Sequence, residues 1–362
     1  MTALLALCLA LASEPAELPD PGSAAIAAPP HGAGISALMW QMTLEEKAAQ
    51  ILLAYPQLDR EGPVDVGGVL MIGPLLKDLD RARALIASSR RRARIPPFFA
   101  ADIEGGDFNR LKRHPDLALL PSAAALGALP DAEVEAWGSR IGRVMHEVGL
   151  NMNLAPVLDV ASSGHMSDNH RSFGGEADLV VAKGLAFAKG LSGSGVIPVA
   201  KHFPGYGDLP GDTDHALVTA AWDRQRVERE MSVFQQVDGV MGGVMMANVS
   251  YAAYGGVPAV LDPELVQAAQ GQGWLTVTDD LAIGVLGDTV GGTPEQVVRR
   301  AFLAGNDLLL TTAPPDWDQG VDYVGVISQM VREDPALEPR LDRSVRRVLQ
   351  LKARMGLLEG DR

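Results

Sequence analysis

The feature that most constrains the fold is a repeated alternation between short apolar runs and longer amphipathic segments. The apolar runs are continuous, as expected for parallel strands buried on both faces, and cover residues 66–73, 98–104, 150–160, 196–203, 243–250, 274–280 and 307–311. Segments with helical periodicity lie between them, at residues 79–92, 131–148, 179–191, 227–237, 263–269 and 294–303. This alternation predicts βαβ units, and its persistence favours a closed α/β fold, a single (β/α)8 TIM-type barrel, over an open sheet.

Local signals mark helices near both ends of this pattern. Thr43 and Glu46 have the spacing of a capping box, in which side chains satisfy free N–H groups at a helix start. We expect the helix that follows to include residues 47–53. Towards the other end, residues 344–355 predict an amphipathic, basic helix that ends at Gly356. We therefore expect one barrel domain over residues 35–362.

The first residues have the pattern of a targeting segment. Residues 3–12 are almost all Ala and Leu and end in an Ala-x-Ala motif, as at a signal-peptide cleavage site, although no Lys or Arg precedes them. This run is too short to span a bilayer. Residues 13–34 are rich in Pro, Ala and Gly and predict a flexible leader. We expect residues 1–34 to be signal peptide and leader and the protein to be exported, with a cytoplasmic location as the alternative.

Charge and cysteine usage narrow the function classes. A net charge of −14 argues against nucleic acid or an anionic membrane as the main partner. The single cysteine, Cys8, excludes a disulfide framework and a cysteine-rich metal site. The histidines match no zinc-binding template, and glycine-rich pieces such as residues 205–207 lack the context of a phosphate-binding loop. We expect no metal and no cofactor, and the sequence does not give the oligomeric state.

Polar and charged residues stand at the C-terminal ends of most apolar runs. They are Asp102, Glu104, Asp159, Lys201, His202, Asn248, Asp279 and Asp280. In a TIM barrel the active site lies on the face formed by the carboxyl ends of the strands. We therefore expect these side chains, which are far apart in the sequence, to converge in one pocket.

The chemistry of this set favours a carbohydrate ligand. A group of carboxylates without cysteine indicates either glycoside hydrolysis or an oxygen-ligated metal. Arg110, Arg171 and Lys201 would share the same rim, where they would compete with a metal for the carboxylates and suit hydrogen bonds to a polyhydroxylated ligand. Any one Asp at such a position can simply cap the next helix, but the whole group favours a functional cluster.

The most specific segment is residues 201–215, Lys-His-Phe-Pro-Gly-Tyr-Gly-Asp-Leu-Pro-Gly-Asp-Thr-Asp-His. It resembles the signature of the β-N-acetylglucosaminidases of glycoside hydrolase family 3, in which Lys-His-Phe-Pro-Gly-x-Gly precedes Asp-Ser/Thr-His. Further stretches are similar to family motifs in the same order, at residues 42–47, 102–110, 151–159, 171–174, 278–281 and 304–307. The resemblance extends over roughly residues 34–358 and is strong as a set.

The resemblance implies a retaining exo-β-glycosidase, most similar to the β-N-acetylhexosaminidases that release N-acetylhexosamine from peptidoglycan- or chitin-derived saccharides. It implies that Asp279 is the nucleophile that forms a covalent glycosyl-enzyme. It also implies that the sugar hydroxyls are held by Asp102, Arg110, Arg171, Lys201 and His202. In this family a loop histidine, oriented by a nearby aspartate, protonates the leaving oxygen.

The loop that carries this histidine departs from the family pattern. Asp212 and Thr213 match the Asp-Ser/Thr pair, but Asp214 occupies the histidine position and His215 follows one residue late. Three interpretations stay open: a shifted loop delivers His215, Asp214 is the acid, or the donor is lost and a noncatalytic sugar-binding barrel remains. Tyr206 also differs from the usual residue, as does Asn248 at the end of its run. A β-glucosidase-like activity is therefore a further alternative.

Overall fold

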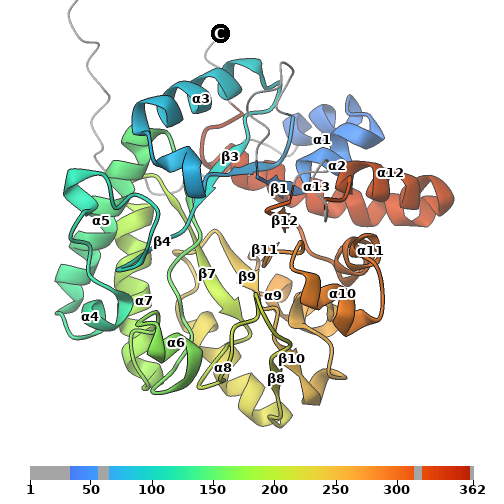
Figure 1. Cartoon of the computed structure of the whole chain (residues 1–362). Helices are drawn as coiled ribbons and strands as arrows, with labels where there is room; N and C mark the ends of the chain where they lie inside the picture. Colours follow the sequence, from blue (N-terminus) through green and yellow to red (C-terminus); the bar gives the residue numbers. More distant parts are fainter. Residues whose placement is uncertain (1–32, 56–64, 314–319, 359–362) are drawn as a thin grey trace, which may run out of the picture.

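The computed structural model describes residues 33–55, 65–313 and 320–358, and Figure 1 shows helices arranged around a central group of strands. Within these residues, the main sheet has 8 strands in the order β11-β9-β7-β6-β3-β2-β1-β12, and its paired neighbours are parallel. A parallel bridge between Val277 and Leu308 joins the two ends of this sheet. The prediction of a single α/β barrel of the TIM type is confirmed.

The barrel strands are short. They are β1 (Leu52–Ala54), β2 (Gly68–Leu70), β3 (Phe98–Ala101), β6 (Met152–Asn153), β7 (Ile197–Phe203), β9 (Gly243–Met246), β11 (Leu275–Thr278) and β12 (Leu309–Thr311). Outside the barrel, β4 (Ile103–Gly105) pairs with β5 (Phe108–Asn109), and β8 (Thr219–Ala220) pairs with β10 (Ser250–Tyr251). These small sheets lie after barrel strands, on the face where the predicted site residues occur.

The longer helices connect successive strands, except that the last two follow the final strand, β12. They are α3 (Leu79–Arg92), α5 (Asp131–Val148), α7 (Ala177–Ser192), α8 (Arg224–Gln236), α9 (Pro263–Gly271), α11 (Pro294–Ala304), α12 (Tyr323–Glu333) and α13 (Glu338–Arg354). Shorter helices are α1 (Ala33–Trp40), α2 (Leu44–Gln50), α4 (Ala123–Gly127), α6 (Gly164–Asp168) and α10 (Gly284–Val290). The sequence pattern predicted most of the long helices but missed α12 and placed the start of α13 too late.

The predicted helix over residues 47–53 is partly wrong. The capping box is present, because the Thr43 hydroxyl accepts from the Glu46 N–H at 3.1 Å and the Glu46 carboxylate accepts from the Thr43 N–H at 2.7 Å. However, α2 ends at Gln50, and the next residues form β1, in which Leu53 pairs with Leu310. A short apolar run fits a helix and a buried strand equally well, so periodicity did not separate them.

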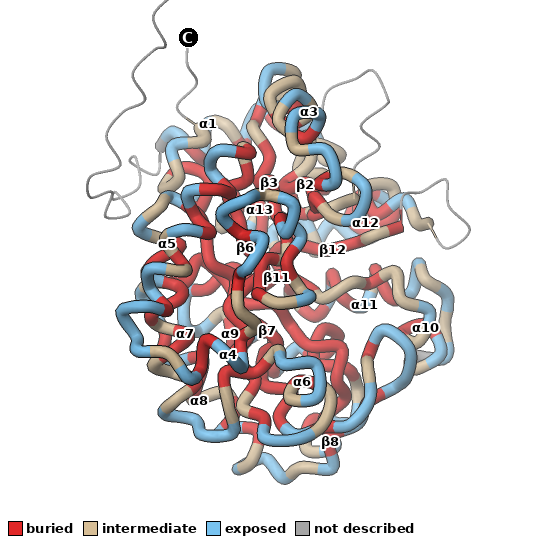
Figure 2. The backbone as a smooth tube through the Cα atoms, turned by 60° about the vertical axis from the view of Figure 1, so that its left-hand side comes forward, coloured by how far each residue is buried: buried red, intermediate tan, exposed pale blue. Residues whose placement is uncertain are grey.

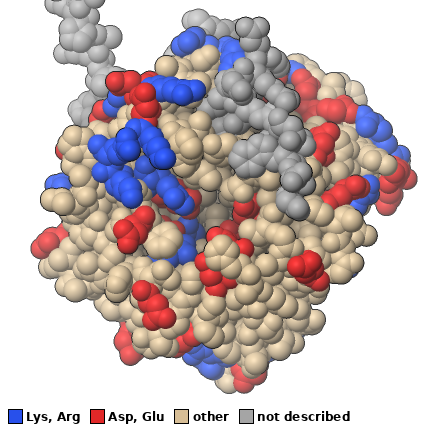
Figure 3. Space-filling model, in the orientation of Figure 1, with Lys and Arg blue, Asp and Glu red and all other residues tan. Residues whose placement is uncertain are grey.

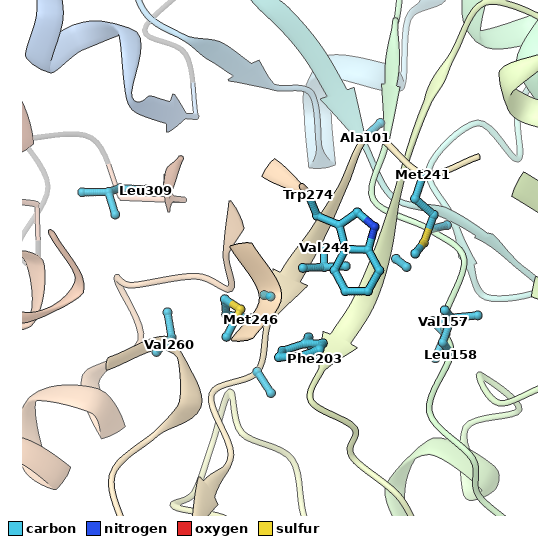
Figure 4. Close-up of a cluster of buried hydrophobic side chains, with 14 of the residues drawn as sticks. Ala101, Val157, Leu158, Phe203, Met241, Val244, Met246, Val260, Trp274 and Leu309 are labelled. Atoms are coloured by element: carbon cyan, nitrogen blue, oxygen red, sulfur yellow. The ribbon is translucent and has the colours of Figure 1, made fainter. Parts of the chain in front are cut away.

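Two layers of apolar side chains hold the barrel together. Leu53, Leu70, Phe98 and Val199 belong to a cluster of strand residues that fills the barrel. A larger cluster lies between the strands and the helices, and Figure 4 shows part of it around Trp274. Figure 2 shows the same division as a buried centre surrounded by helices with exposed outer faces. Alternate strand residues thus face the two layers, as in other barrels of this type.

The predicted signal peptide and leader lie outside the described residues, except that residues 33 and 34 begin α1. Cys8 also lies outside them. Among the helices that the structure describes, none combines the length and the apolar character that a membrane crossing requires.

Candidate active site

A pocket lies at the carboxyl ends of the barrel strands and has a volume of about 190 Å³. Figure 3 shows a hollow near the centre of this face, with acidic and basic side chains around it. The predicted site residues that line the pocket are Asp102, Arg110, Arg171, Lys201, His202, Asp212, Asp214 and Asp279. Of the eight strand-end side chains expected to converge, six line this pocket, whereas Asp159 and Asn248 do not. Of the residues predicted to act in catalysis or to hold sugar hydroxyls, His215 alone does not line the pocket.

A buried ion cluster forms one wall. Glu104, in β4, is 4% exposed and accepts two hydrogen bonds of 2.8 Å from Nε and Nη2 of Arg171. Lys201, at the end of β7, places Nζ 2.7 Å from Glu104 Oε1 and 2.7 Å from Asp102 Oδ1. Arg171 also lies over the Phe108 ring, with Cζ 4.4 Å from its centroid. The bidentate pair fixes the guanidinium plane, so this wall presents charged groups in defined positions.

The cluster keeps its members charged. Burial alone would raise the pKa of Glu104, but Arg171 and Lys201 lower it well below its usual range. Burial would lower the pKa of Lys201, but Asp102 and Glu104 raise it. Burial also opposes the charge of Arg171, whose pKa is nevertheless raised by Glu104. The wall is therefore ionised at neutral pH, because each charge compensates the desolvation of its partner.

His202 is held by a fully buried carboxylate. Its Nδ1 lies 2.7 Å from Asp159 Oδ2, and its backbone N–H donates to Asp159 Oδ1 at 3.2 Å. The same oxygen accepts the Tyr206 N–H at 2.7 Å. Asp159 is 0% exposed and does not line the pocket, so it acts through His202. Because a carboxylate can only accept a hydrogen bond, Nδ1 carries a proton, and in the neutral ring Nε2 is then an acceptor.

The two adjacent aspartates after β11 differ in their surroundings. Asp280 accepts from the backbone N–H groups of Ala282 at 3.0 Å and Thr312 at 3.1 Å and from the Thr312 hydroxyl. Asp279 accepts only a bond of 2.8 Å from the Asp280 N–H among the side-chain contacts within the described chain. Asn248 donates to the Asp280 carbonyl at 3.2 Å and so supports this turn. The structure thus leaves the Asp279 carboxylate turned to the pocket.

Burial raises the pKa of Asp279, and nearby Asp214 raises it further, while His202 and Lys201 lower it. A carboxylate flanked by Lys or Arg ordinarily stays ionised at neutral pH. Lys201 instead binds Asp102 and Glu104 directly, and it acts on Asp279 only as a weaker, more distant charge. The free site therefore favours the ionised form of Asp279 less than a directly paired cation would.

The loop after β7 separates its two candidate acids. Asp214 lines the pocket, and desolvation raises its pKa, with further increases from Asp212 and Asp280. Its backbone N–H donates to Asp212 Oδ1 at 3.0 Å. The His215 side chain is 83% exposed, and its Nε2 lies 3.9 Å from Asp212 Oδ2. In this arrangement the residue at the family's histidine position faces the pocket, and the histidine one residue later faces solvent.

Glu104 and His165 line the pocket but were not among the residues predicted to act in catalysis or to hold sugar. Glu104 had been placed at a strand end but was given no binding role, although it is the centre of the ion cluster. His165, on α6, lines the pocket and was considered only as a possible metal ligand. No sequence signal places α6 against the loop after β7, so this position could not be predicted. In the described parts of the chain, no group of three or more His, Cys, Asp and Glu side chains is arranged to hold a metal.

The chain is similar to known glycosidases in its sequence. The model of the glycosyl hydrolase family 3 N terminal domain matches residues 43–351. A beta-hexosaminidase of Vibrio cholerae is 29% identical over 255 residues, which are 68% of this chain and 74% of that protein. A beta-N-acetylglucosaminidase/beta-glucosidase of Cellulomonas fimi is 29% identical over 314 residues, which are 82% of this chain and 53% of that protein.

Solved structures show the same likeness. A beta-N-acetylhexosaminidase from Beutenbergia cavernae has a TM-score of 0.76 and 27% identity, and the match covers 85% of this chain and 98% of that one. A family 3 beta-N-acetylglucosaminidase from a Paenibacillus species has a TM-score of 0.79 and 30% identity, with 89% of this chain and 64% of that one covered. With the family model spanning the barrel and its strand-end pocket, the chain belongs to glycosyl hydrolase family 3 and is a glycoside hydrolase.

Proposed function

We propose that this protein is a retaining exo-β-N-acetylhexosaminidase that cleaves N-acetylglucosamine from the non-reducing ends of saccharides. The observation that carries the proposal is the placement of Asp279 and Asp214 on one pocket beside a charged wall suited to sugar hydroxyls. The hexosaminidases among the similar proteins support the N-acetyl sugar as the preferred substrate.

In this proposal Asp279 is the nucleophile. Its carboxylate attacks the anomeric carbon as the bond to the leaving oxygen breaks, and a covalent glycosyl-enzyme forms. Asp280 does not take this role, because its oxygens are occupied by Thr312 and Ala282. Binding of sugar would bring Asp279 closer to C1, where positive charge develops and favours the carboxylate form.

Asp214 is the proposed acid and base. Protonated Asp214 gives its proton to the leaving oxygen in the first step, and its carboxylate removes a proton from water in the second. Its raised pKa favours the protonated form that the first step needs. The position of His215 outside the pocket favours Asp214 over the shifted-loop interpretation.

The charged wall is the proposed site for the terminal sugar. Asp102, Arg171 and Lys201 offer one carboxylate and two cations that line the pocket, and His202 offers a ring nitrogen. Arg110 lines the pocket from an exposed position. Such a mixed set of donors and acceptors suits a ring of hydroxyl groups better than a purely anionic ligand.

Export is part of the proposal but rests on residues 3–12 alone. An exported enzyme of this kind would meet peptidoglycan fragments or chitin oligomers. Its carbohydrate substrates would then be supplied by enzymes that cut these polymers.

The test is hydrolysis of 4-nitrophenyl N-acetyl-β-glucosaminide beside the corresponding β-glucoside. We expect wild type to prefer the N-acetyl substrate and Asp279→Ala to lose at least about 10⁴-fold in kcat, because the nucleophile supplies a separate part of the mechanism. Thermal unfolding of the variant serves as the control for folding.

Two outcomes would contradict the proposed mechanism, and a third would contradict the proposed substrate. Near wild-type turnover by Asp279→Ala would remove the nucleophile from this position. A wild type that hydrolyses neither substrate yet binds N-acetylglucosamine would favour the noncatalytic sugar-binding barrel. A preference for the β-glucoside would keep the mechanism but change the substrate.

A further inference from the structure

His165 is a second histidine of the pocket that the proposed mechanism does not use. It lies on α6, which follows β6, and its side chain lines the pocket together with Asp212 and Asp214. Its ring packs near Tyr206, with the centroids 5.9 Å apart. It thus reaches the acid loop from a different element of the barrel.

Backbone contacts fasten this part of the chain to the acid loop. The His165 N–H donates to the Leu209 carbonyl at 3.0 Å. Asp208 Oδ1 accepts the backbone N–H groups of Ser162 at 2.7 Å and Ser163 at 2.9 Å. At Gly164 the two segments are so close that a Cβ would lie 2.5 Å from the Asp208 carbonyl oxygen. The position of His165 is therefore fixed relative to the loop that carries Asp214.

The hydrogen bonds of Asn169 define which ring nitrogen carries the proton. Asn169 Nδ2 donates to the His165 carbonyl at 2.9 Å, and this bond sets the orientation of the amide. The same Nδ2 lies 3.4 Å from His165 Nδ1, which must then accept. The neutral ring consequently has its proton on Nε2. Within the described part of the chain, no residue accepts from this N–H, which leaves it for a ligand in the pocket.

Burial keeps His165 neutral, although the charges around it act in both directions. Burial lowers its pKa, and Arg171 and His202 lower it further, while Asp212 and Asp214 raise it. The net shift is downward, so at neutral pH the ring is a neutral donor rather than an acid. This separates its role from that of the histidine that the family pattern has in the loop.

We infer that His165 is a substrate-binding residue of the leaving-group side, where its Nε2–H donates to an oxygen of a sugar aglycone. The inference rests on the proposed function, because the acid that protonates the leaving oxygen has to lie on that side of the scissile bond. His165, docked on the same loop, shares that side. The substrate class is then a saccharide with a sugar on both sides of the bond, rather than a glycoside of an apolar alcohol.

The experiment compares His165→Phe and His165→Gln with wild type on two substrates. Di-N-acetylchitobiose has a sugar leaving group, and 4-nitrophenyl N-acetyl-β-glucosaminide has an aromatic one without hydroxyls. We expect His165→Phe to lose roughly three- to tenfold in kcat/KM on chitobiose, the value of one neutral hydrogen bond, and to stay within about twofold on the aryl glycoside. We expect His165→Gln to keep most of the chitobiose activity, because its amide offers a neutral N–H near the same place.

The matched control is His146→Phe, at an exposed position on α5 outside the pocket, which should match wild type on both substrates. Equal losses on both substrates in His165→Phe would show a purely structural role and overturn the inference. Equal losses in the Gln and Phe variants would also overturn the inference. A neutral N–H donor would then not be sufficient, and the imidazole itself would be needed to transfer a proton.

Failure of the proposed function has a different signature. A wild type that hydrolyses neither substrate contradicts that function but leaves a direct test of His165. Calorimetric binding of chitobiose by wild type and His165→Phe then decides the inference. A three- to tenfold weaker affinity of the variant supports the donor, and equal affinities refute it.

Discussion

The charged wall of the pocket and the loop over residues 208–215 are built on opposite principles. In the wall, Arg171 and Lys201 bind Glu104 at 2.7–2.8 Å, and Glu104 and Lys201 are almost completely buried. In the loop, Asp214 is exposed, and its backbone N–H donates to Asp212 Oδ1 at 3.0 Å. The ion pairs of the wall fix its charges and stabilise the fold. The carboxylate of the loop has no such partner, so it can gain and lose a proton.

The difference follows from the chemistry that we propose for each region. A group that binds hydroxyls works best when its charge and position never change, and a buried bidentate ion pair provides both. A proton donor has to lose and regain its proton in each cycle, so strong ion pairs would hold it in one state. Charge changes in the wall should therefore affect folding, and those in the loop should affect the pH dependence of catalysis.

Among the substitutions that test this contrast between wall and loop, Glu104→Gln should have the largest effect, a loss of stability. The change leaves Arg171 without its carboxylate and Lys201 with Asp102 alone, and removing one partner of a buried pair costs about 3 to 5 kcal/mol of unfolding free energy. Chemical denaturation at pH 7 measures this loss. A variant as stable as wild type would show that the wall is not held together by its charges.

The pH dependence of the same variant sharpens the test. The pKa of Glu104 is depressed in the folded state, so its contribution is present above the unfolded pKa and is lost as the pH falls below it. Wild type should therefore lose stability between about pH 5 and more acidic values, towards the lowered folded pKa. Glu104→Gln should show a smaller loss over that range, and parallel curves would contradict the assignment.

The second largest effect is expected in the loop, from the substitution Asp214→Asn. We expect a fall of about 10²- to 10⁴-fold in kcat on a disaccharide, because proton transfer to a poor leaving group is lost. The first step on a 4-nitrophenyl glycoside should suffer much less, since nitrophenolate leaves with little protonation. Folding should be unaffected, in contrast to Glu104→Gln. Equal losses on both substrates in the first step would argue against an acid at this position.

The pH profile gives the direction of this effect. A general acid has to be protonated, so activity should fall as the pH rises through the pKa of Asp214, which the pocket raises above its ordinary value. The nucleophile has to be ionised, so activity should also fall at low pH. Burial raises the pKa of Asp279 and should therefore move this acid limb to higher pH. In Asp214→Asn the alkaline limb of kcat/KM should disappear while the acid limb remains.

The sequence predicted the barrel because each parallel strand is buried on both faces and leaves a continuous apolar run. It failed at β1, where four apolar residues after α2 fit a helix as well as a strand. For the site, the position of Asp279 and Lys201 at strand ends was enough to predict their convergence. The pairing of Glu104 with Arg171 and the docking of α6 depend on distances between loops, which no local pattern encodes.

Local patterns also could not decide whether Asp214 or His215 is the acid. The motif predicted that Asp212, Asp214 and His215 lie near the active site, and the structure places the first two in the pocket lining. Which of two adjacent residues faces the pocket depends on a turn in which the His215 N–H donates to the Asp212 carbonyl at 3.1 Å. Spacing alone left these alternatives open, because a change of one residue reverses the direction of a side chain in a turn.

The smallest effect is expected from His215→Ala, and it separates the interpretations most directly. With a side chain 83% exposed and only a 3.9 Å contact to Asp212, His215 should contribute less than about twofold to kcat/KM, since exposed ion pairs contribute little. Steady-state kinetics on chitobiose at several pH values measures this. If the loop instead closes over a bound sugar and turns His215 inward, the variant would lose the alkaline limb that we assign to Asp214. Because both substitutions lie on one loop, their unequal effects would establish which side chain carries the proton.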